Sequence, residues 1–183
     1  LIGYSESNRS GGIAASRYAV YRAQAALVRA AAETAVALNI FHGRGGTAIR
    51  GGGPIEVLVQ SAPPGAVGSC LRATEQGEVV AHSYGLEPLA LRTFEQAIHA
   101  TLLATAGRKP GPVPVSHHEE VMAVVARASR ERYRALVFGE PGFERWFRSV
   151  TPIDVIELMQ IGSRSSTRKL AEGLAALRSI PWV

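Results

Sequence analysis

Residues 41–54 read FHGRGGTAIRGGGP, and six of them are glycine where an average usage of about 7% predicts one. Glycine permits positive φ and close backbone approach, so consecutive amides can turn toward one bound anion. Arg44 and Arg50 add forked, charge-assisted donors. We therefore predict a loop that binds a phosphate or a carboxylate. The alternative is a flexible linker, but linkers seldom carry a histidine and spaced arginines among their glycines.

The loop matches neither of the two common nucleotide-binding patterns. A Walker A loop requires Gly-Lys-Ser/Thr, and none follows these glycines. The dinucleotide fingerprint requires a following helix and a distant acidic residue, which are also missing. Generic motifs therefore leave the ligand of this loop unassigned.

The sequence before the loop predicts a strand at residues 1–4, a polar turn at residues 5–12, a helix at residues 13–38 and a strand at residues 39–42. The helix is apolar over most of its circumference, which predicts packing on several sides. Strand, turn, helix, strand and glycine loop together form a βα pattern. In such units the functional loops follow the carboxyl ends of the strands.

The sequence after the loop is predicted to become mainly helical. Residues 55–60 are either helix or strand, residues 61–65 form a loop, and strands are expected at residues 70–74 and 78–82. From residue 87 onward the pattern favours helices. We expect them at residues 88–106, 116–138, 143–150 and 152–160, with a surface connection at residues 107–115.

Composition excludes several classes of protein. The chain has 183 residues, 46% of them hydrophobic, which is enough for a globular core. A net charge of +5 suits an anionic substrate or a polyanionic surface. Cys70 is the single cysteine, so no internal disulfide can form and a reducing cytoplasm fits best. We expect no membrane span, and both ends of the sequence look cut from something longer.

Other polar clusters have simpler interpretations. His82 and His99 are expected to be core or surface histidines, and the adjacent His117 and His118 point in different directions on a helix, which disfavours a metal site. A group of aromatic residues around Trp146 is interpreted as core packing. The arginines and tyrosine at positions 127–134 are interpreted as a solvated or salt-bridged face rather than a nucleic-acid patch.

Five blocks of sequence resemble the phosphoenolpyruvate carboxylase family, in the family's order. FHGRGG followed by a second RGG resembles its signature. The other blocks are GYSESNRSGG (residues 3–12), PPG (63–65), TEQGE with YGL (74–78 and 84–86), and GSR with LRSIPW (162–164 and 177–182). The similarity therefore spans the whole chain.

The resemblance implies an enzyme that converts phosphoenolpyruvate and bicarbonate to oxaloacetate and phosphate, fixing carbon and supplying the tricarboxylic acid cycle. It implies a magnesium or manganese cofactor, a cytoplasmic homotetramer, and neither nucleic acid nor membrane as a partner. The catalytic residues that it implies are His42, Arg44, Arg50 and Arg9. The implied substrate-binding residues are Arg44, Gly45, Gly46, Arg164 and Arg178, and the implied metal ligand is Glu6.

The resemblance also implies a mainly α fold with a parallel β-barrel component, part of a (β/α)8-like barrel embedded in a predominantly helical protein. Residues 1–183 would form a single segment of a larger catalytic domain. Residues 1–86 would supply barrel strands and active-site loops, and residues 87–183 would be mostly helical. The segment alone should be inactive.

Several positions depart from the family pattern within the predicted active-site loops. The family's first loop normally reads Asp-Ser-x-Lys-Asp, whereas this chain has Glu6, Arg9 and Ser10 at the three charged positions. The other departures are Ile49, Ala62 and Ser83. They leave two alternatives to a carboxylase: a divergent relative with altered chemistry or only a ligand-binding role, and, more remotely, a basic nucleic-acid-binding domain.

Overall fold

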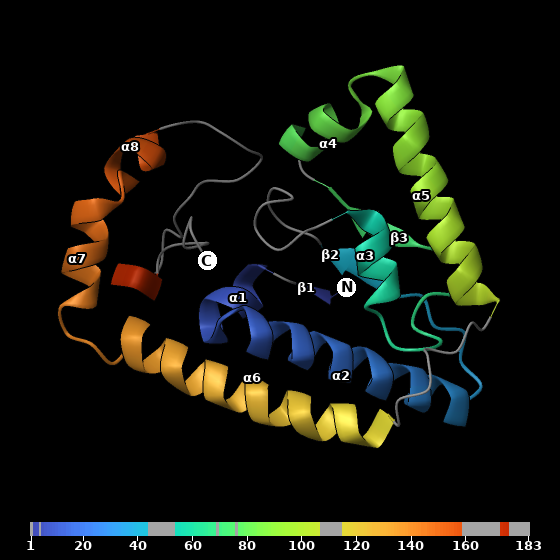
Figure 1. Cartoon of the computed structure of the whole chain (residues 1–183), viewed down its shortest axis with the longest axis horizontal. Coiled ribbons are helices and arrows are strands. Elements are labelled where there is room, and N and C mark those ends of the chain that lie inside the picture. The colour runs from blue at the N-terminus through green and yellow to red at the C-terminus, as the bar shows by residue number, and fades with distance from the viewer. Residues whose placement is uncertain are drawn as a thin grey trace.

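The computed structural model describes residues 2–3, 5–43, 54–68, 70–75, 77–106, 115–158 and 173–175. Within these ranges helices predominate around one small sheet (Figure 1). The strands are β1 (Ile2–Gly3), β2 (Phe41–Gly43) and β3 (Arg72–Thr74). The helices are α1 (Ser5–Gly11), α2 (Ile13–Glu33), α3 (Ile55–Gln60), α4 (Gly77–Tyr84), α5 (Glu87–Thr105), α6 (Val115–Val137), α7 (Phe143–Val150) and α8 (Ile153–Leu158), followed by the 3-10 turn η2 (Gly173–Ala175).

The described strands form a parallel sheet in the order β1-β2-β3. His42 of β2 lies in register with Ile2 on one side and with Ala73 on the other. Because all the strands run the same way, their carboxyl ends lie along one edge of the sheet. A mainly helical fold with a parallel β component is therefore confirmed, but these strands make a small open sheet and not a closed eight-stranded barrel.

The prediction of a polar turn at residues 5–12 is wrong, because residues Ser5–Gly11 form α1. The chain turns only at Gly12, whose φ of +79° lies in the left-handed region that favours glycine. The Gly12 amide donates to the carbonyl oxygen of Asn8 at 2.7 Å, closing the last turn of α1. The turn-forming side chains are overridden here by tertiary packing, since α1 lies against both α2 and α6.

Helix α2 begins where the sequence predicts and ends five residues early. It stops at Glu33 instead of Leu38, and Ala35 then adopts a φ of +52°. The Thr34 hydroxyl donates to the carbonyl oxygen of Ala30 at 2.8 Å, which satisfies an acceptor at the helix end. Among the described elements α2 packs mainly on α1 and α6, so Leu27 stays exposed despite the expected packing on several sides.

The predicted strand at residues 78–82 is also wrong, because this segment belongs to α4. Its short β-branched run, Val79 and Val80, cannot distinguish strand from helix by periodicity. Tyr84 at the end of α4 contacts Phe94 of α5, with ring centroids 5.3 Å apart, and this packing accompanies the helical form. The ambiguous residues 55–60 are helical and form α3.

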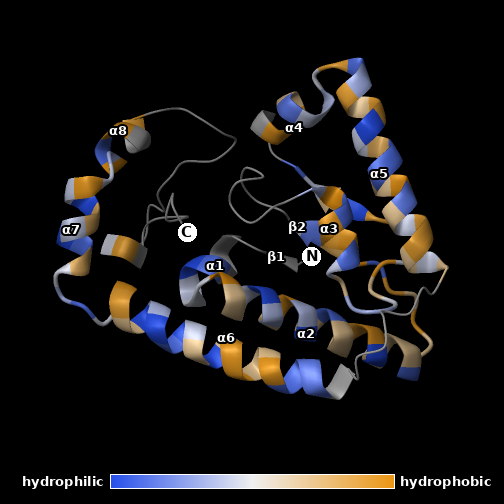
Figure 2. Cartoon of the chain, viewed as in Figure 1, coloured by the Kyte–Doolittle hydropathy of each residue, from blue (hydrophilic) through white to orange (hydrophobic). Residues whose placement is uncertain are grey.

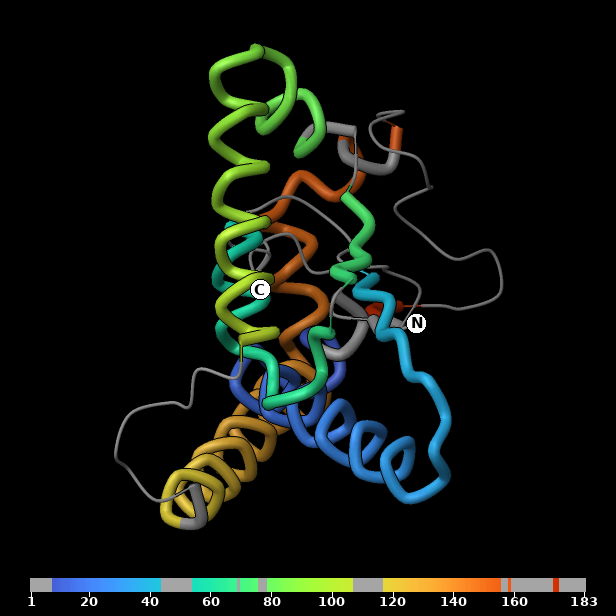
Figure 3. The backbone as a smooth tube through the Cα atoms, turned by 90° about the vertical axis from the view of Figure 1, so that its right-hand side faces the viewer, coloured from blue at the N-terminus to red at the C-terminus, as the bar shows by residue number. Residues whose placement is uncertain are grey.

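The helices predicted after residue 87 are confirmed to within a few residues. Residues 143–150 match α7 at both ends, and α5 and α6 each begin and end one residue before the predicted positions. Helix α6 lies beside α2 in Figure 1, and α5 extends away from this pair in the side view of Figure 3. The predicted connection at residues 107–115 lies outside the described residues except for Val115.

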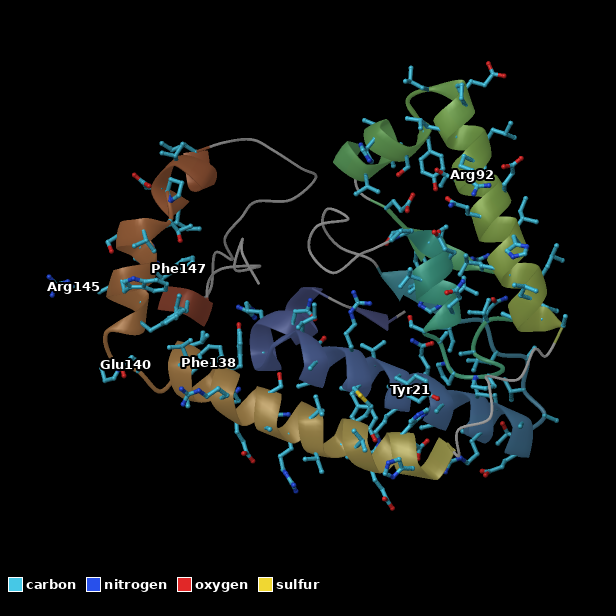
Figure 4. The ribbon with its side chains drawn as sticks, viewed as in Figure 1. Tyr21, Arg92, Phe138, Glu140, Arg145 and Phe147 are labelled. Atoms are coloured by element: carbon cyan, nitrogen blue, oxygen red, sulfur yellow. The ribbon has the colours of Figure 1, made fainter. Side chains whose placement is uncertain are left out.

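Two hydrophobic clusters join several of the described helices. One joins Val137, Phe143, Phe147 and Ile153, with Tyr133 and Leu174 packed against it. The other joins Val59, Val67 and Ala100, linking α3 and the following loop to α5. Phe147 is fully buried, whereas its neighbour Trp146 is 50% exposed (Phe147 is labelled in Figure 4). The core prediction for the aromatic group is therefore confirmed for the phenylalanines and wrong for Trp146.

Candidate functional site

The carboxyl ends of the parallel strands bring the predicted site segments to one edge of the sheet. Strand β1 leads into α1, which carries Glu6 and Arg9. Strand β2 leads directly into the glycine-rich loop, and β3 leads to Glu75. Parallel α/β proteins bind ligands at this edge, because the loops that follow the strands converge there. The topology thus places the carboxyl ends of β1 and β2, which precede α1 and the glycine-rich loop in the sequence, at the same edge of the sheet.

His42 occupies the central strand of this sheet. Its side chain is only 1% exposed, and Gly43 is the one residue between it and Arg44. A buried imidazole is held in a fixed orientation by its surroundings, which is what a proton-transferring or oxygen-stabilising group requires. The structure therefore places His42 as a rigid side chain immediately before the glycine-rich loop.

Glu6 and Arg9 lie three residues apart on α1. Positions at this spacing fall on the same face of a helix. Arg9 is partly buried, whereas Ser10 is exposed. The side chain of Glu6, the predicted metal ligand, lies outside the described part of the structure.

Helix α6 contacts α1 at Ser10, the residue that follows Arg9 in the sequence. The guanidinium of Arg134 donates to the carbonyl oxygen of Ser10 at 3.2 Å. The side-chain hydroxyl of Tyr133 is buried and makes no hydrogen bond within the described residues. Burial raises the pKa of this phenol above its usual 10.0, and the nearby charge of Arg9 partly opposes the rise.

Sequence reasoning missed this contribution of α6. It assigned the arginines and tyrosine of residues 127–134 to a solvated or salt-bridged face, which fits the four arginines, because Arg127, Arg130, Arg132 and Arg134 are all exposed. It did not predict that Arg134 also donates to the Ser10 carbonyl oxygen of α1, or that the partly buried Tyr133 lies against Gly12. The available signal was the spacing of Arg130, Tyr133 and Arg134, which lie on one side of a helix.

The predicted substrate-binding residues, together with the predicted catalytic residue Arg50, all lie outside the described part of the chain. This holds for the residues of the glycine-rich loop and of the segments on either side of η2. They are Arg44, Gly45, Gly46, Arg50, Arg164 and Arg178. Their assignment remains a prediction from the sequence.

The described residues do not assemble a metal site by themselves. Within residues 5–43, 54–68, 70–75, 77–106 and 115–158, no three His, Cys, Asp or Glu side chains gather closely enough to hold an ion. His117 and His118 are both exposed. Over the same ranges, no helix combines the length and the apolar character required to cross a membrane.

Comparisons with known proteins agree with the sequence blocks. The family model described as phosphoenolpyruvate carboxylase matches residues 1–183. Phosphoenolpyruvate carboxylases of Xanthomonas euvesicatoria, Mycobacterium avium and Picea abies are 50%, 45% and 41% identical to the chain over its whole length. The chain spans about a fifth of the length of these curated relatives, 20%, 20% and 19% respectively. With a match from its first residue to its last, the chain belongs to the phosphoenolpyruvate carboxylase family.

Proposed function

We propose that this chain supplies part of the active site of a phosphoenolpyruvate carboxylase. The observation that carries the proposal is the family match over residues 1–183, with relatives of that name 41–50% identical throughout. The edge of the sheet supports it, because β1 precedes the segment with the predicted metal ligand and Arg9, and β2 precedes the glycine-rich loop. The parent protein, meaning the full-length protein that carries this chain, would be the enzyme.

The reaction explains the residue types in these segments. A bicarbonate oxygen attacks the phosphorus of phosphoenolpyruvate, the bond from phosphorus to the enol oxygen breaks, and carboxyphosphate and the pyruvate enolate result. Carboxyphosphate then releases carbon dioxide and phosphate, and the enolate carbon captures the carbon dioxide to form oxaloacetate. Each step develops negative charge on oxygen, and preorganised cationic donors stabilise such charge.

The proposed roles follow the order of the segments. Arg44 and Arg178 hold the phosphate with the amides of Gly45 and Gly46, Arg164 lies near them, and Arg50 neutralises the group in transfer. Arg9, at the family's lysine position, provides positive charge from α1. His42, held rigidly in β2, stabilises the enolate or transfers a proton beside it.

We propose Glu6 as one ligand of a Mg²⁺ or Mn²⁺ ion whose other protein ligands come from the rest of the parent. The ion would supply Lewis-acid stabilisation of oxygen charge. Glu6 is one methylene longer than the family's aspartate, so a change in metal affinity is expected.

The parent would extend the small parallel sheet into a (β/α)8-like barrel, surrounded by helices, in a cytoplasmic homotetramer. Exposed apolar residues on α5, which Figure 2 colours in alternating orange and blue, support a larger protein, since they recur at helical spacing. They are Leu91, Phe94, Ile98 and Leu102, each more than half exposed. Such a surface is normally covered in the functional state.

The departures from the family pattern favour a second candidate, a divergent relative that binds phosphoenolpyruvate or a similar acid without carboxylating it. Glu6, Arg9 and Ser10 replace the three charged residues of the family's first loop, and all three lie on α1. In that case the arginine site for the phosphate would persist while the chemistry beside it would differ.

An oxaloacetate assay on the purified parent separates these candidates. With phosphoenolpyruvate, Mg²⁺ and bicarbonate, oxaloacetate should form in proportion to bicarbonate, and Arg44→Ala should lower kcat/KM by at least about a thousandfold. Arg132→Ala is the matched control, because Arg132 is exposed on α6 and should leave turnover unchanged. A folded parent that binds phosphoenolpyruvate and forms no bicarbonate-dependent product would favour the divergent relative.

A titration with Mg²⁺ tests the proposed metal ligand. Glu6→Gln keeps the length of the side chain and removes its charge, so the half-saturating Mg²⁺ concentration should rise by at least about tenfold. Glu131→Gln provides a control carboxylate, because Glu131 is exposed on α6. Equal metal dependence in the Glu6→Gln variant and the wild type would remove Glu6 from the metal site.

A further inference from the structure

Three residues of α6 contact three consecutive backbone positions just after Arg9. The Arg134 guanidinium donates to the carbonyl oxygen of Ser10 at 3.2 Å. A Cβ added at Gly11 would lie 3.5 Å from Cγ of Arg130, and one added at Gly12 would lie 3.3 Å from Cβ, Cγ and Cδ2 of Tyr133. We call Arg130, Tyr133 and Arg134 the α6 contact face.

The α6 contact face is a single side of the helix. Its members stand at positions i, i+3 and i+4, which is the spacing of neighbouring side chains on one helical surface. The exposed Arg132 belongs to the opposite side. The Arg134 guanidinium carbon also lies 5.2 Å from the ring centroid of Phe138, so a cation–π contact helps hold it toward α1.

The contacted segment is the junction that sets the direction of α1. Gly11 and Gly12 are both buried, and the φ of +79° at Gly12 separates α1 from α2. Without side chains at these positions, the backbone can approach α6 closely. Any displacement of α6 from this junction would therefore move α1, and with it Arg9 and Glu6.

The C-terminal helices fix the position of the α6 contact face in turn. Tyr133 packs against the cluster of Val137, Phe143, Phe147 and Ile153, in which Phe147 is fully buried. The ring of Tyr133 also meets Phe138 at 6.2 Å in an edge-on arrangement. The buried cluster thus packs against Tyr133, whose ring contacts the junction of α1 and α2 at Gly12.

We propose that the α6 contact face positions Arg9 for catalysis, although the two segments lie more than 120 residues apart in the sequence. This inference rests on the proposed carboxylase function. Tyr133, Arg134 and Arg130 act through α1 and are positioning residues that touch neither substrate nor reacting atoms. The influence of the Arg9 charge on the Tyr133 phenol supports their proximity.

The test compares ring removal at two places in the parent protein. Tyr133→Ala removes the ring that faces Gly12, Tyr133→Phe retains it, and Tyr18→Ala is the matched control. Tyr18 also joins α2 to α6, through its hydroxyl and the carbonyl oxygen of Glu119 at 3.0 Å, but it makes no described contact with α1. Arg134→Gln is a second variant that leaves the hydrophobic cluster intact.

A positioning role predicts a specific kinetic pattern. Tyr133→Ala and Arg134→Gln should each lower kcat by about tenfold and change the KM for phosphoenolpyruvate by less than about threefold. Tyr133→Phe and Tyr18→Ala should stay within about twofold of wild type. In a parent that already carries Arg9→Lys, Tyr133→Ala should lower kcat little further, because the effects of substitutions at residues that act as one unit are not additive.

Hydrogen exchange in residues 5–12 provides a readout that does not depend on activity. Tyr133→Ala and Arg134→Gln should speed exchange there, and Tyr18→Ala should not. If hydrogen exchange in residues 5–12 responds as expected while neither the wild type nor any variant carboxylates phosphoenolpyruvate, the result refutes the proposed carboxylase function. That result would still support the contact between α6 and the junction of α1 and α2. If Tyr133→Ala matches Tyr18→Ala in both exchange and kcat, or if its effect adds fully to that of Arg9→Lys, the positioning role is wrong.

Discussion

The hydroxyl of Tyr18 on α2 donates a hydrogen bond to the main-chain carbonyl oxygen of Glu119 on α6, at 3.0 Å and across 101 residues of sequence. This bond joins the beginning of α6 to α2. A net contribution of about 0.5–1 kcal/mol is typical of such a bond. Tyr18→Phe should therefore speed hydrogen exchange in residues 115–121 of the parent by about two- to fivefold.

Tyr21→Phe is the control for this prediction, because Tyr21 lies on the same helix (Figure 4) and makes no hydrogen bond within the described residues. Exchange in residues 115–121 should be unchanged in that variant. Equal exchange in both variants would mean that the Tyr18 bond does not stabilise the start of α6.

Gly12 should be intolerant of even the smallest side chain. Gly12→Ala forces an L-residue to a φ of +79° and brings a Cβ within 3.3 Å of the Tyr133 ring. The strain should destabilise the folded state by about 1–2 kcal/mol. The matched variant Gly68→Ala places its Cβ in open space, so it should be nearly neutral. Thermal midpoints of the two parent variants at one scan rate check this, and equal midpoints would contradict it.

Phe147 should contribute more to stability than its neighbour Trp146. Phe147 is fully buried in the cluster that packs behind α6, whereas Trp146 is 50% exposed on the same helix. Phe147→Ala should cost about 3–5 kcal/mol, because it removes buried surface and leaves a cavity. Trp146→Ala should cost clearly less, although it loses a tilted contact with Phe143. Proteolysis within residues 133–153 at increasing temperature measures the difference, and a reversed order would refute it.

The sequence predicted those elements whose local pattern agrees with their packing. Residues 143–150 match α7, and the start of α2 at Ile13 was expected from the glycines before it, because both features depend on near neighbours. The segments at 5–12 and 78–82 were misread for the opposite reason. Packing of α1 on α6 and of α4 on α5 decides their helical form, and such contacts are not visible in a short window of sequence.

The candidate site likewise has features that local sequence predicts and features that depend on contacts between distant residues. The position of His42 before the glycine-rich loop was predictable, because a strand followed by glycines is a local signal. The contact of Arg134 with Ser10 was not, because 124 residues separate them and an arginine-rich helix is usually a solvated face. Arg44, Arg50, Arg164 and Arg178 lie outside the described residues, so their roles rest on the family pattern.

Tyr133 should make the folded state sensitive to alkaline pH. In the unfolded chain its phenol loses a proton near pH 10.0, whereas burial raises the pKa in the folded state despite the opposing charge of Arg9. The unfolded state therefore releases the proton first, so this contribution to stability is fully present below pH 10.0 and is lost as the pH rises toward the folded pKa. Tyr133→Phe cannot ionise. Its thermal midpoint should fall less than that of wild type between about pH 9 and about pH 11, and a parallel fall would show that the buried phenol does not govern alkaline stability.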